Sequence, residues 1–326
     1  MNTASTAELT KQSPFGKRLE AYLNQRFPLL SHGILIVSYY SSNQFLAEVL
    51  TRPDEKLVYN LGSILGALAI FCTFFHLRVF DEHKDYESDL KYYPERVLQR
   101  GLITLGHLKI LGAVAIALEL VCAAVWMPLG KPAALVAVLV TLGYSVLMLN
   151  EFFVSRWLSQ RFLLYAISHM LIMPLLAMVV FSFTTGDYFW NAPGWFWFYA
   201  FVGFFVTLNW EISRKIRAPE QEIEGVESYT QIFGTYGAAY AVLLVRIFDT
   251  AIVALVGWHI GASQWFYIAL IVLFGVCLVG FFQYRFRTSP QTAKRMETYA
   301  GIYIIAFDLI LAVELISRMG IRFAWS

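Results

Sequence analysis

Residues 57–89 read LVYNLGSILGALAIFCTFFHLRVFDEHKDYESD, an apolar run followed at once by a dense acidic stretch. The run, residues 57–80, is longer than the roughly 20 residues that an α-helix needs to cross a bilayer. Five carboxylates then fall within nine residues, between Asp81 and Asp89. Carboxylates at the end of a membrane helix are costly unless they hold a positive charge. These residues therefore predict a membrane helix that ends in a cation-binding site.

The rest of the chain has the composition of a membrane protein. Its 326 residues are 58% hydrophobic and only 15% charged, with a mean hydropathy of +0.57. A soluble domain has about 25% charged residues. We predict an all-α, polytopic membrane protein of about nine transmembrane helices. The predicted spans lie near residues 28–50, 57–80, 107–127, 132–153, 162–183, 194–212, 234–258, 264–284 and 299–317.

The residues before the first span form a polar lead-in, residues 1–26, and residues 27–326 are expected to form a single transmembrane domain. Phe15, Leu19, Leu23 and Phe27 are spaced four apart, which suits a short amphipathic helix lying at the membrane interface. A simple polar lead-in is the alternative. Because no small-residue cleavage site closes the first span, we expect it to be retained and not removed as a signal peptide.

The distribution of basic residues predicts the orientation. With the N-terminus inside, 18 Lys and Arg residues fall on the cytoplasmic side and five on the other. Positive charge accumulates in cytoplasmic loops, so the N-terminus and the acidic stretch are expected to face the cytoplasm. The formal net charge is only +2, and no basic tract indicates nucleic acid as a partner.

The acidic stretch suggests a magnesium–phosphate site. In a continuous helix, Asp81, Asp85 and Asp89 would stand on one face, where like charges at this spacing destabilise a helix without a counter-charge. Mg²⁺ binds carboxylate and phosphate oxygens together, so a phosphate ester bridged by the metal is the first hypothesis. Arg96 and Arg100 follow closely and would bind the remaining phosphate oxygens. A solvated linker between helices is the alternative.

A second charged loop follows the sixth predicted span, on the same side of the membrane. It carries Glu211, Glu220 and Glu222 as candidate ligands of a second metal, and Arg214 and Lys215 as candidate diphosphate-binding residues. Simple pairing of these opposite charges is the alternative. The two charged loops are four helices apart, the spacing expected of a duplicated four-helix unit with one extra helix.

Polar residues within spans are functional candidates because burying them in lipid is costly. Candidates for binding a second substrate, the acceptor of a transferred group, are His169, Tyr144 and Asn150. His169 would orient or deprotonate this acceptor. A packing role for the histidine is the alternative. Arg246 and Asp249 are expected to form an internal ion pair, and Glu314 is within reach of Arg318.

The acidic stretch resembles the first signature of the UbiA superfamily of intramembrane prenyltransferases, Asn/Asp-Asp-x-x-Asp-x-x-x-Asp, which Asp81-Glu82-x-x-Asp85-x-x-x-Asp89 matches position by position. The family's Arg-Pro-x-x-Ser-Gly element resembles residues 96–101, which keep the Arg and the Gly but lose the Pro. The second loop departs from the family, which usually has several Asp residues there.

The resemblance implies a prenyltransferase that binds a prenyl diphosphate through Mg²⁺ at the cytoplasmic mouth of a helix bundle in the lipid bilayer. The leaving pyrophosphate would be stabilised by metal and basic residues, and the allylic cation by aromatic faces. The acceptor is expected to be a small aromatic molecule of hydroxyquinoline, hydroxybenzoate or naphthoate type. The departure in the second loop favours specialised metabolism, with a quinolone farnesyltransferase as the narrowest hypothesis. A terpene cyclase of the same fold, or a transporter or receptor, are the alternatives.

Together, these patterns assign roles to the following residues. The predicted catalytic residues are Asp81, Asp85, Asp89 and Glu211. The predicted metal ligands are Asp81, Glu82, Asp85, Asp89, Glu211 and Glu222. The predicted diphosphate-binding residues are Lys84, Arg96, Arg100, Arg214 and Lys215.

Overall fold

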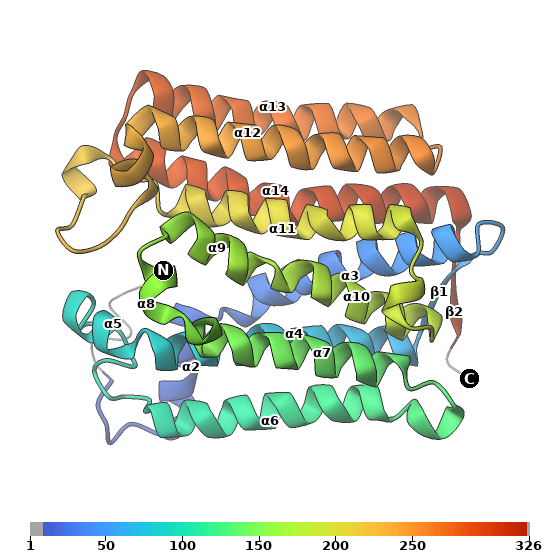
Figure 1. Cartoon of the computed structure of the whole chain (residues 1–326), viewed down its shortest axis with the longest axis horizontal. Coiled ribbons are helices and arrows are strands. Elements are labelled where there is room, and N and C mark those ends of the chain that lie inside the picture. Colours follow the sequence, from blue (N-terminus) through green and yellow to red (C-terminus); the bar gives the residue numbers. More distant parts are fainter. Residues whose placement is uncertain (1–8, 325–326) are drawn as a thin grey trace.

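The computed structural model describes residues 9–324. Long helices lying side by side make up most of the described chain (Figure 1). Their bounds are α3 (Leu29–Thr51), α4 (Leu61–Lys84), α6 (Leu105–Ala124), α7 (Ala133–Leu149), α9 (Phe162–Met170), α10 (Ile172–Thr185), α11 (Gly194–Arg214), α12 (Tyr229–His259), α13 (Gln264–Phe286) and α14 (Pro290–Met319). The shorter helices are α2 (Phe15–Arg26), α5 (Tyr86–Tyr92) and α8 (Ser155–Ser159). The mostly helical fold agrees with the prediction.

Within the described residues, six helical segments are long and apolar enough to cross a membrane, with α9 and α10 counted as one segment. The predicted number of nine is not confirmed. The other three predicted spans form helices α3, α7 and α11, which are too short or too polar to meet this criterion of length and hydropathy. Helix α3 carries several polar side chains and α7 has only 17 residues. Helix α11 contains Asn209, Glu211 and three Trp residues, which lower its hydropathy.

One predicted span begins later than expected, because residues 57–60 form a strand. Strand β1 (Leu57–Asn60) pairs in parallel with β2 (Ile321–Ala324), near the end of the chain. The Val58 amide donates to Glu48 Oε2 (2.7 Å), and Gln44 Nε2 donates to the Val58 carbonyl (2.6 Å). Asn60 then caps α4 in a capping box with Ser63. The predicted span near residues 57–80 therefore begins four residues later, at Leu61, and a two-stranded sheet accompanies the helices.

The helices form two four-helix units with α3 between them. In the first unit α4 packs against α6 and α10, and α7 also packs against α6 and α10. In the second unit α11 packs against α12 and α14, and α13 packs against the same two helices. Helix α3 contacts α4 and α10 of the first unit and α14 of the second. This is the arrangement predicted from the spacing of the two charged loops.

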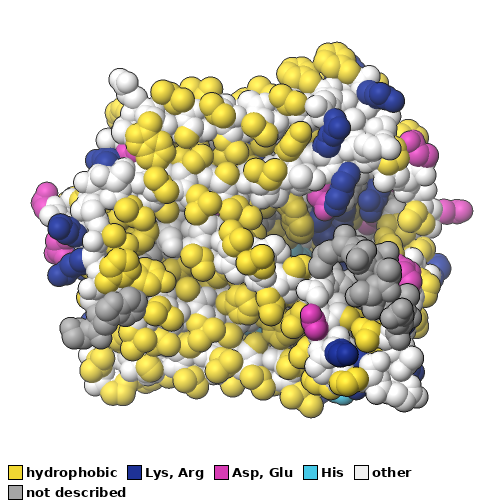
Figure 2. Space-filling model, turned by 180° about the vertical axis from the view of Figure 1, so that it is seen from behind, with side chains coloured by type: hydrophobic (Ala, Val, Ile, Leu, Met, Phe, Trp, Pro, Cys, Tyr) yellow, Lys and Arg dark blue, Asp and Glu magenta, His cyan; other side chains and the backbone are white. Residues whose placement is uncertain are grey.

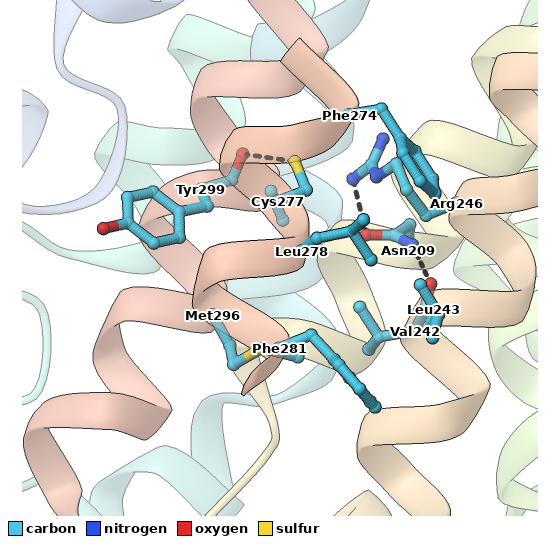
Figure 3. Close-up of a pocket in the computed structure, with 11 residues that line it drawn as sticks. Asn209, Val242, Leu243, Arg246, Phe274, Cys277, Leu278, Phe281, Met296 and Tyr299 are labelled. Atoms are coloured by element: carbon cyan, nitrogen blue, oxygen red, sulfur yellow. Dashed lines mark hydrogen bonds between the residues drawn. The ribbon is translucent and has the colours of Figure 1, made fainter. Parts of the chain in front are cut away.

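Each unit has a buried polar group at its centre. In the second unit, Arg246 Nη1 pairs with Asp249 Oδ2 (2.9 Å), which confirms the predicted ion pair, and Nη2 donates to Asn209 Oδ1 (2.6 Å). Figure 3 shows Arg246 and Asn209 pointing toward each other in a pocket lined by α11, α12, α13 and α14. In the first unit, His76 Nδ1 lies 3.2 Å from Glu119 Oε2. The contacts of Arg246 compensate a charge that would otherwise be costly in an apolar bundle.

The outer surface agrees with an integral membrane protein. Apolar side chains cover the middle of the face in Figure 2, and charged side chains gather toward its two ends. Large apolar residues are strongly exposed, among them Leu30, Trp258 and Ile271, which are 69–79% accessible. An apolar surface of this extent needs a lipid or protein partner. Helix α5 and the loop between α11 and α12 lie at the same end of the bundle (Figure 1, left).

Candidate active site

The acidic stretch keeps its helical hydrogen bonds but bends at Asp85. The Asp85 amide donates to the Asp81 carbonyl and the Asp89 amide donates to the Asp85 carbonyl, both at 2.8 Å. The backbone of Asp85 (φ −93°, ψ 3°) departs from the helix, so α4 ends at Lys84 and α5 begins at Tyr86. The three aspartates follow one another at single helical turns, but the helix in which they were expected to share one face is interrupted at Asp85.

Two carboxylates of this stretch are held by arginines. Arg26 Nε, at the end of α2, lies 2.5 Å from Glu82 Oε1, and the Glu82 side chain is only 1% exposed. Arg78 Nε also approaches Glu82 at 3.6 Å. Asp89 Oδ2 accepts from Arg96 Nη1 (2.5 Å) and lies 3.5 Å from Arg26 Nη2. A metal at Glu82 or Asp89 would have to compete with these ion pairs.

The other two aspartates are better placed to hold a cation. Asp81 is 44% exposed and lies 3.2 Å from Arg78 Nη2 and 3.6 Å from Lys84 Nζ. No ion pair to Asp85 occurs within residues 9–324. Burial raises the pKa of the Asp85 carboxyl, the Lys84 charge opposes that rise, and the neighbouring Asp81 and Asp89 charges add to it. A bound cation would favour the ionised form of this carboxyl.

Magnesium fits Asp81 and Asp85 chemically. Mg²⁺ is commonly held by one or two carboxylates together with phosphate oxygens of the substrate, so two aspartates are sufficient on the protein side. Within the described chain, no group of three His, Cys, Asp or Glu side chains is close enough to hold a metal ion on its own. The predicted six-carboxylate set is thus not assembled around one point.

Glu211 lies in the last turn of α11, because this helix continues to Arg214 into the predicted second loop, and it binds two cations. Glu211 is 6% exposed, and its two oxygens bind Arg214 Nε (2.5 Å) and Lys215 Nζ (2.7 Å). The Arg214 guanidinium lies 5.1 Å from the centre of the Trp210 ring. The carboxylate and the aromatic ring therefore orient two predicted diphosphate-binding residues side by side.

Glu222, predicted as a metal ligand, lies in a separate hydrogen-bonded cluster. Its carboxylate accepts hydrogen bonds from the hydroxyls of Ser228 (2.9 Å) and Thr230 (2.5 Å) and from Gln231 Nε2 (2.8 Å). These three residues lie at the start of α12. The present role of Glu222 is therefore to fix the loop to the beginning of this helix.

The charged ends of α4 and α11 approach each other at one end of the bundle. Arg214, the last residue of α11, interacts electrostatically with Asp81 near the end of α4. His169 on α9 is within electrostatic range of Lys84, Asp81 and Glu211. The ends of α4, α9 and α11 thus bring two carboxylates, three cations and one imidazole to one place. This is the arrangement that a metal-bound diphosphate requires.

The other predicted arginines lie at the edge of this site. Arg96, paired with Asp89, also lies 3.9 Å from the centre of the Tyr93 ring. Arg100 Nη2 donates to the Leu9 carbonyl at 3.0 Å, which fixes the amino-terminal segment to the first loop.

Of the predicted acceptor residues, the structure brings two together. Tyr144 donates its hydroxyl to the Ser168 carbonyl (2.6 Å), next to His169. The Phe152 ring makes edge contacts with both Tyr144 (5.5 Å) and His169 (6.0 Å). Asn150 instead donates to the Val146 carbonyl of its own helix at 2.8 Å.

Sequence reasoning missed Tyr165 and Arg26. The Tyr165 ring stacks on His169 at 4.1 Å and lies 5.1 Å from Lys84 Nζ. Its position four residues before His169 on the same helix was a usable signal. Arg26 had no such local signal, because 56 residues separate it from Glu82.

A model described as the UbiA prenyltransferase family matches residues 55–304, which include both charged loops. The chain belongs to the UbiA prenyltransferase family. The family predicted from the residues Asp81–Asp89 is therefore confirmed, and with it a membrane-bound prenyltransferase. A comparison with curated proteins gives no match.

Two solved structures show that the UbiA fold extends over nearly the whole chain. One is the apo structure of a UbiA homolog from Aeropyrum pernix K1, with a TM-score of 0.65 and 15% identity, covering 88% of this chain and 98% of that one. The other is a digeranylgeranylglyceryl phosphate synthase, with a TM-score of 0.59 and 17% identity, covering 92% of this chain and 99% of that one. At these identities the likeness establishes the fold alone.

Proposed function

We propose that this UbiA protein transfers a prenyl group from an allylic isoprenyl diphosphate to a small aromatic acceptor, with Mg²⁺ bound at Asp81 and Asp85. The observation that carries the proposal is that Asp81 lies near Lys84 and Arg214, and that Arg214 shares the Glu211 carboxylate with Lys215. A metal-bound diphosphate needs carboxylates for the metal and nitrogen donors for its remaining oxygens. Glu211, also predicted to be catalytic, would orient Arg214 and Lys215, and Asp89 would orient Arg96.

The chemistry begins with departure of the diphosphate. The C–O bond of the allylic diphosphate breaks, and its electron pair leaves with the pyrophosphate. When bound, Mg²⁺ supplies Lewis-acid stabilisation of that charge. Lys84, Arg214 and Lys215 donate hydrogen bonds to the same oxygens, and their charge counts for more where little water is present.

Aromatic residues near the mouth are suited to stabilise the allylic cation. Tyr165 and Phe162 already lie beside the ammonium groups of Lys84 (5.1 Å) and Lys215 (4.5 Å). Ring faces that attract an ammonium also attract a carbocation. The prenyl tail, of farnesyl length in this proposal, would extend among the apolar helices.

The acceptor would bind beside His169 and Tyr144, with Phe152 as an aromatic wall. An electron-rich ring of hydroxyquinoline, hydroxybenzoate or naphthoate type attacks the allylic cation, and the product keeps the prenyl chain. Because the second loop lacks the family's usual aspartates, we assign the enzyme to specialised metabolism. In this proposal the active-site loops and the N-terminus face the cytoplasm, which is supported by the excess of basic residues on that side. Helix α2 would lie at that interface.

Product analysis tests the proposal. The purified protein is incubated with Mg²⁺, each prenyl diphosphate length and a panel of aromatic acceptors, and products are identified by mass spectrometry. A prenylated acceptor supports transfer. A cyclic hydrocarbon formed without acceptor would instead identify a terpene cyclase, and an intact diphosphate in every reaction would leave the transporter or receptor alternative.

A further inference from the structure

His169 is held in one tautomer and one orientation. Its Nδ1 lies 2.8 Å from the Tyr165 carbonyl, one turn earlier on α9. A carbonyl only accepts, so Nδ1 carries the proton and Nε2 has a free electron pair. The Tyr165 ring stacks on the imidazole with an interplanar angle of 18°, which fixes the plane of the ring.

The electron pair of Nε2 faces a cation. Lys84 Nζ lies 3.4 Å from Nε2, and an ammonium can only donate, so Lys84 covers the basic atom of His169. Lys84 also lies 3.6 Å from Asp81 Oδ1, at the edge of the diphosphate site. The charged groups around His169 are Lys84 and Asp81 from α4 and Glu211 from α11, with Tyr165 as its titratable neighbour on α9.

We propose that His169 is the general base that takes the acceptor's proton, and that Lys84 masks it until a prenyl diphosphate binds. This role rests on the proposed prenyl transfer. Hydrogen bonds between two ionised groups are stronger than those to a neutral acceptor such as Nε2. A diphosphate beside Asp81 therefore draws Lys84 away from His169 and exposes the electron pair. Binding of the prenyl diphosphate thus makes His169 Nε2 available to take the acceptor's proton.

The proton balance of the reaction is complete with this base. The allylic C–O bond breaks and its electron pair leaves with the pyrophosphate. The acceptor ring carbon forms the new C–C bond with the allylic cation. The proton on that carbon passes to Nε2, and the resulting imidazolium returns it to water. No oxidant or reductant is needed.

A strained turn places the Phe152 ring against His169. Glu151, Phe152 and Phe153 have φ values of 47°, 54° and 60°, a left-handed conformation that non-glycine residues rarely adopt. Such strain persists where the surrounding structure enforces it, and it is concentrated at functional sites. Here the turn holds Phe152 edge-on to both His169 and Tyr144. A planar acceptor bound against Phe152 would lie next to Nε2.

The first test separates base catalysis from folding and donor binding. In His169→Gln, we expect kcat for acceptor prenylation to fall about 100-fold or more, the range of general base catalysis. The KM for the prenyl diphosphate should stay within about twofold, and imidazole added to His169→Ala should restore part of the rate. His259→Gln, at the opposite end of the bundle, is the matched control. Unchanged kcat in His169→Gln would overturn the proposal.

The second test observes the unmasking directly, by ¹⁵N NMR of histidine-labelled protein. A thiolodiphosphate analogue of the prenyl donor, which does not ionise, should shift the Nε2 resonance of His169 in the wild type. In Lys84→Met the resonance should already be shifted without the analogue. If the Nε2 resonance of the wild type does not shift when the analogue binds, the masking by Lys84 is refuted. If the wild type prenylates no acceptor at all, the proposed function itself fails.

Discussion

Arg26 Nε lies 2.5 Å from Oε1 of the buried Glu82 and joins the amino-terminal helix α2 to the acidic stretch. The same guanidinium reaches Asp89 at 3.5 Å, so one arginine spans both sides of the bend at Asp85. The stretch is therefore braced by a residue far from it in the sequence. Asp85, which lies between the two braced carboxylates, and Asp81, which directly precedes Glu82, are thereby held in place.

Removing this brace should destabilise the protein. Breaking a buried ion pair costs about 3–5 kcal/mol. Because Arg78 still lies near Glu82 in Arg26→Ala, we expect a smaller fall in the free energy of unfolding, about 2 kcal/mol. Thermal unfolding in detergent measures the change. Lys17→Ala, on an exposed position of the same helix, should shift it by no more than about 0.5 kcal/mol. Equal effects of both variants would rule out the bracing role.

Asp85 should make the metal-free protein less stable as the pH rises. The folded-state pKa of this carboxyl is raised above its ordinary value of 3.8, so the folded state binds its proton more tightly than the unfolded state does. Stability from this group is present at acidic pH and declines as the pH rises through that value toward the higher folded-state pKa. We expect Asp85→Asn to lack this decline and to melt above the wild type at pH 7. A lower melting temperature for Asp85→Asn at pH 7 would contradict the burial argument.

Magnesium should act through the same carboxyl. Mg²⁺ with a thiolodiphosphate analogue should raise the melting temperature of the wild type, because a ligand at 100 times its Kd stabilises by about 2.7 kcal/mol. The rise should be largely absent in Asp85→Asn and Asp81→Asn, and a chelator should abolish activity until Mg²⁺ is returned. An equal rise in Glu82→Gln and wild type would agree with the bracing role of Glu82. An undiminished rise in Asp85→Asn would remove Asp85 from the metal site.

Glu211 should matter for donor binding more than for metal binding. Glu211→Gln removes the charged carboxylate that holds Arg214 and Lys215 side by side. Because the two cations are then no longer oriented toward the diphosphate, we expect the KM for the prenyl diphosphate to rise about tenfold, or 1.4 kcal/mol. The Mg²⁺ concentration that gives half-maximal rate should not change. Glu222→Gln is the control and should leave that KM unaltered, because Glu222 is hydrogen-bonded to Ser228, Thr230 and Gln231 at the start of α12 and not to Arg214 or Lys215. A raised Mg²⁺ requirement in Glu211→Gln would instead make Glu211 a metal ligand.

The sequence carried the local features of the site, and the structure added the distant ones. The spacing of Asp81, Asp85 and Asp89 is a property of consecutive helical turns, so it identified the family without tertiary information. The pair Arg26–Glu82 and the pairing of β1 with β2 join distant segments, which periodicity does not reveal. Hydropathy also counted α11 as an ordinary span, although its aromatic residues and buried Glu211 distinguish it.

The most direct test of the account compares wild type and Asp85→Ala in one reaction, with Mg²⁺, farnesyl diphosphate and the aromatic panel, followed by mass spectrometry and pyrophosphate release. We expect the wild type to form a farnesylated aromatic product with an equal amount of pyrophosphate. Asp85→Ala should remain folded in membranes and form neither. Product formation by Asp85→Ala at the wild-type rate and Mg²⁺ dependence would contradict the account.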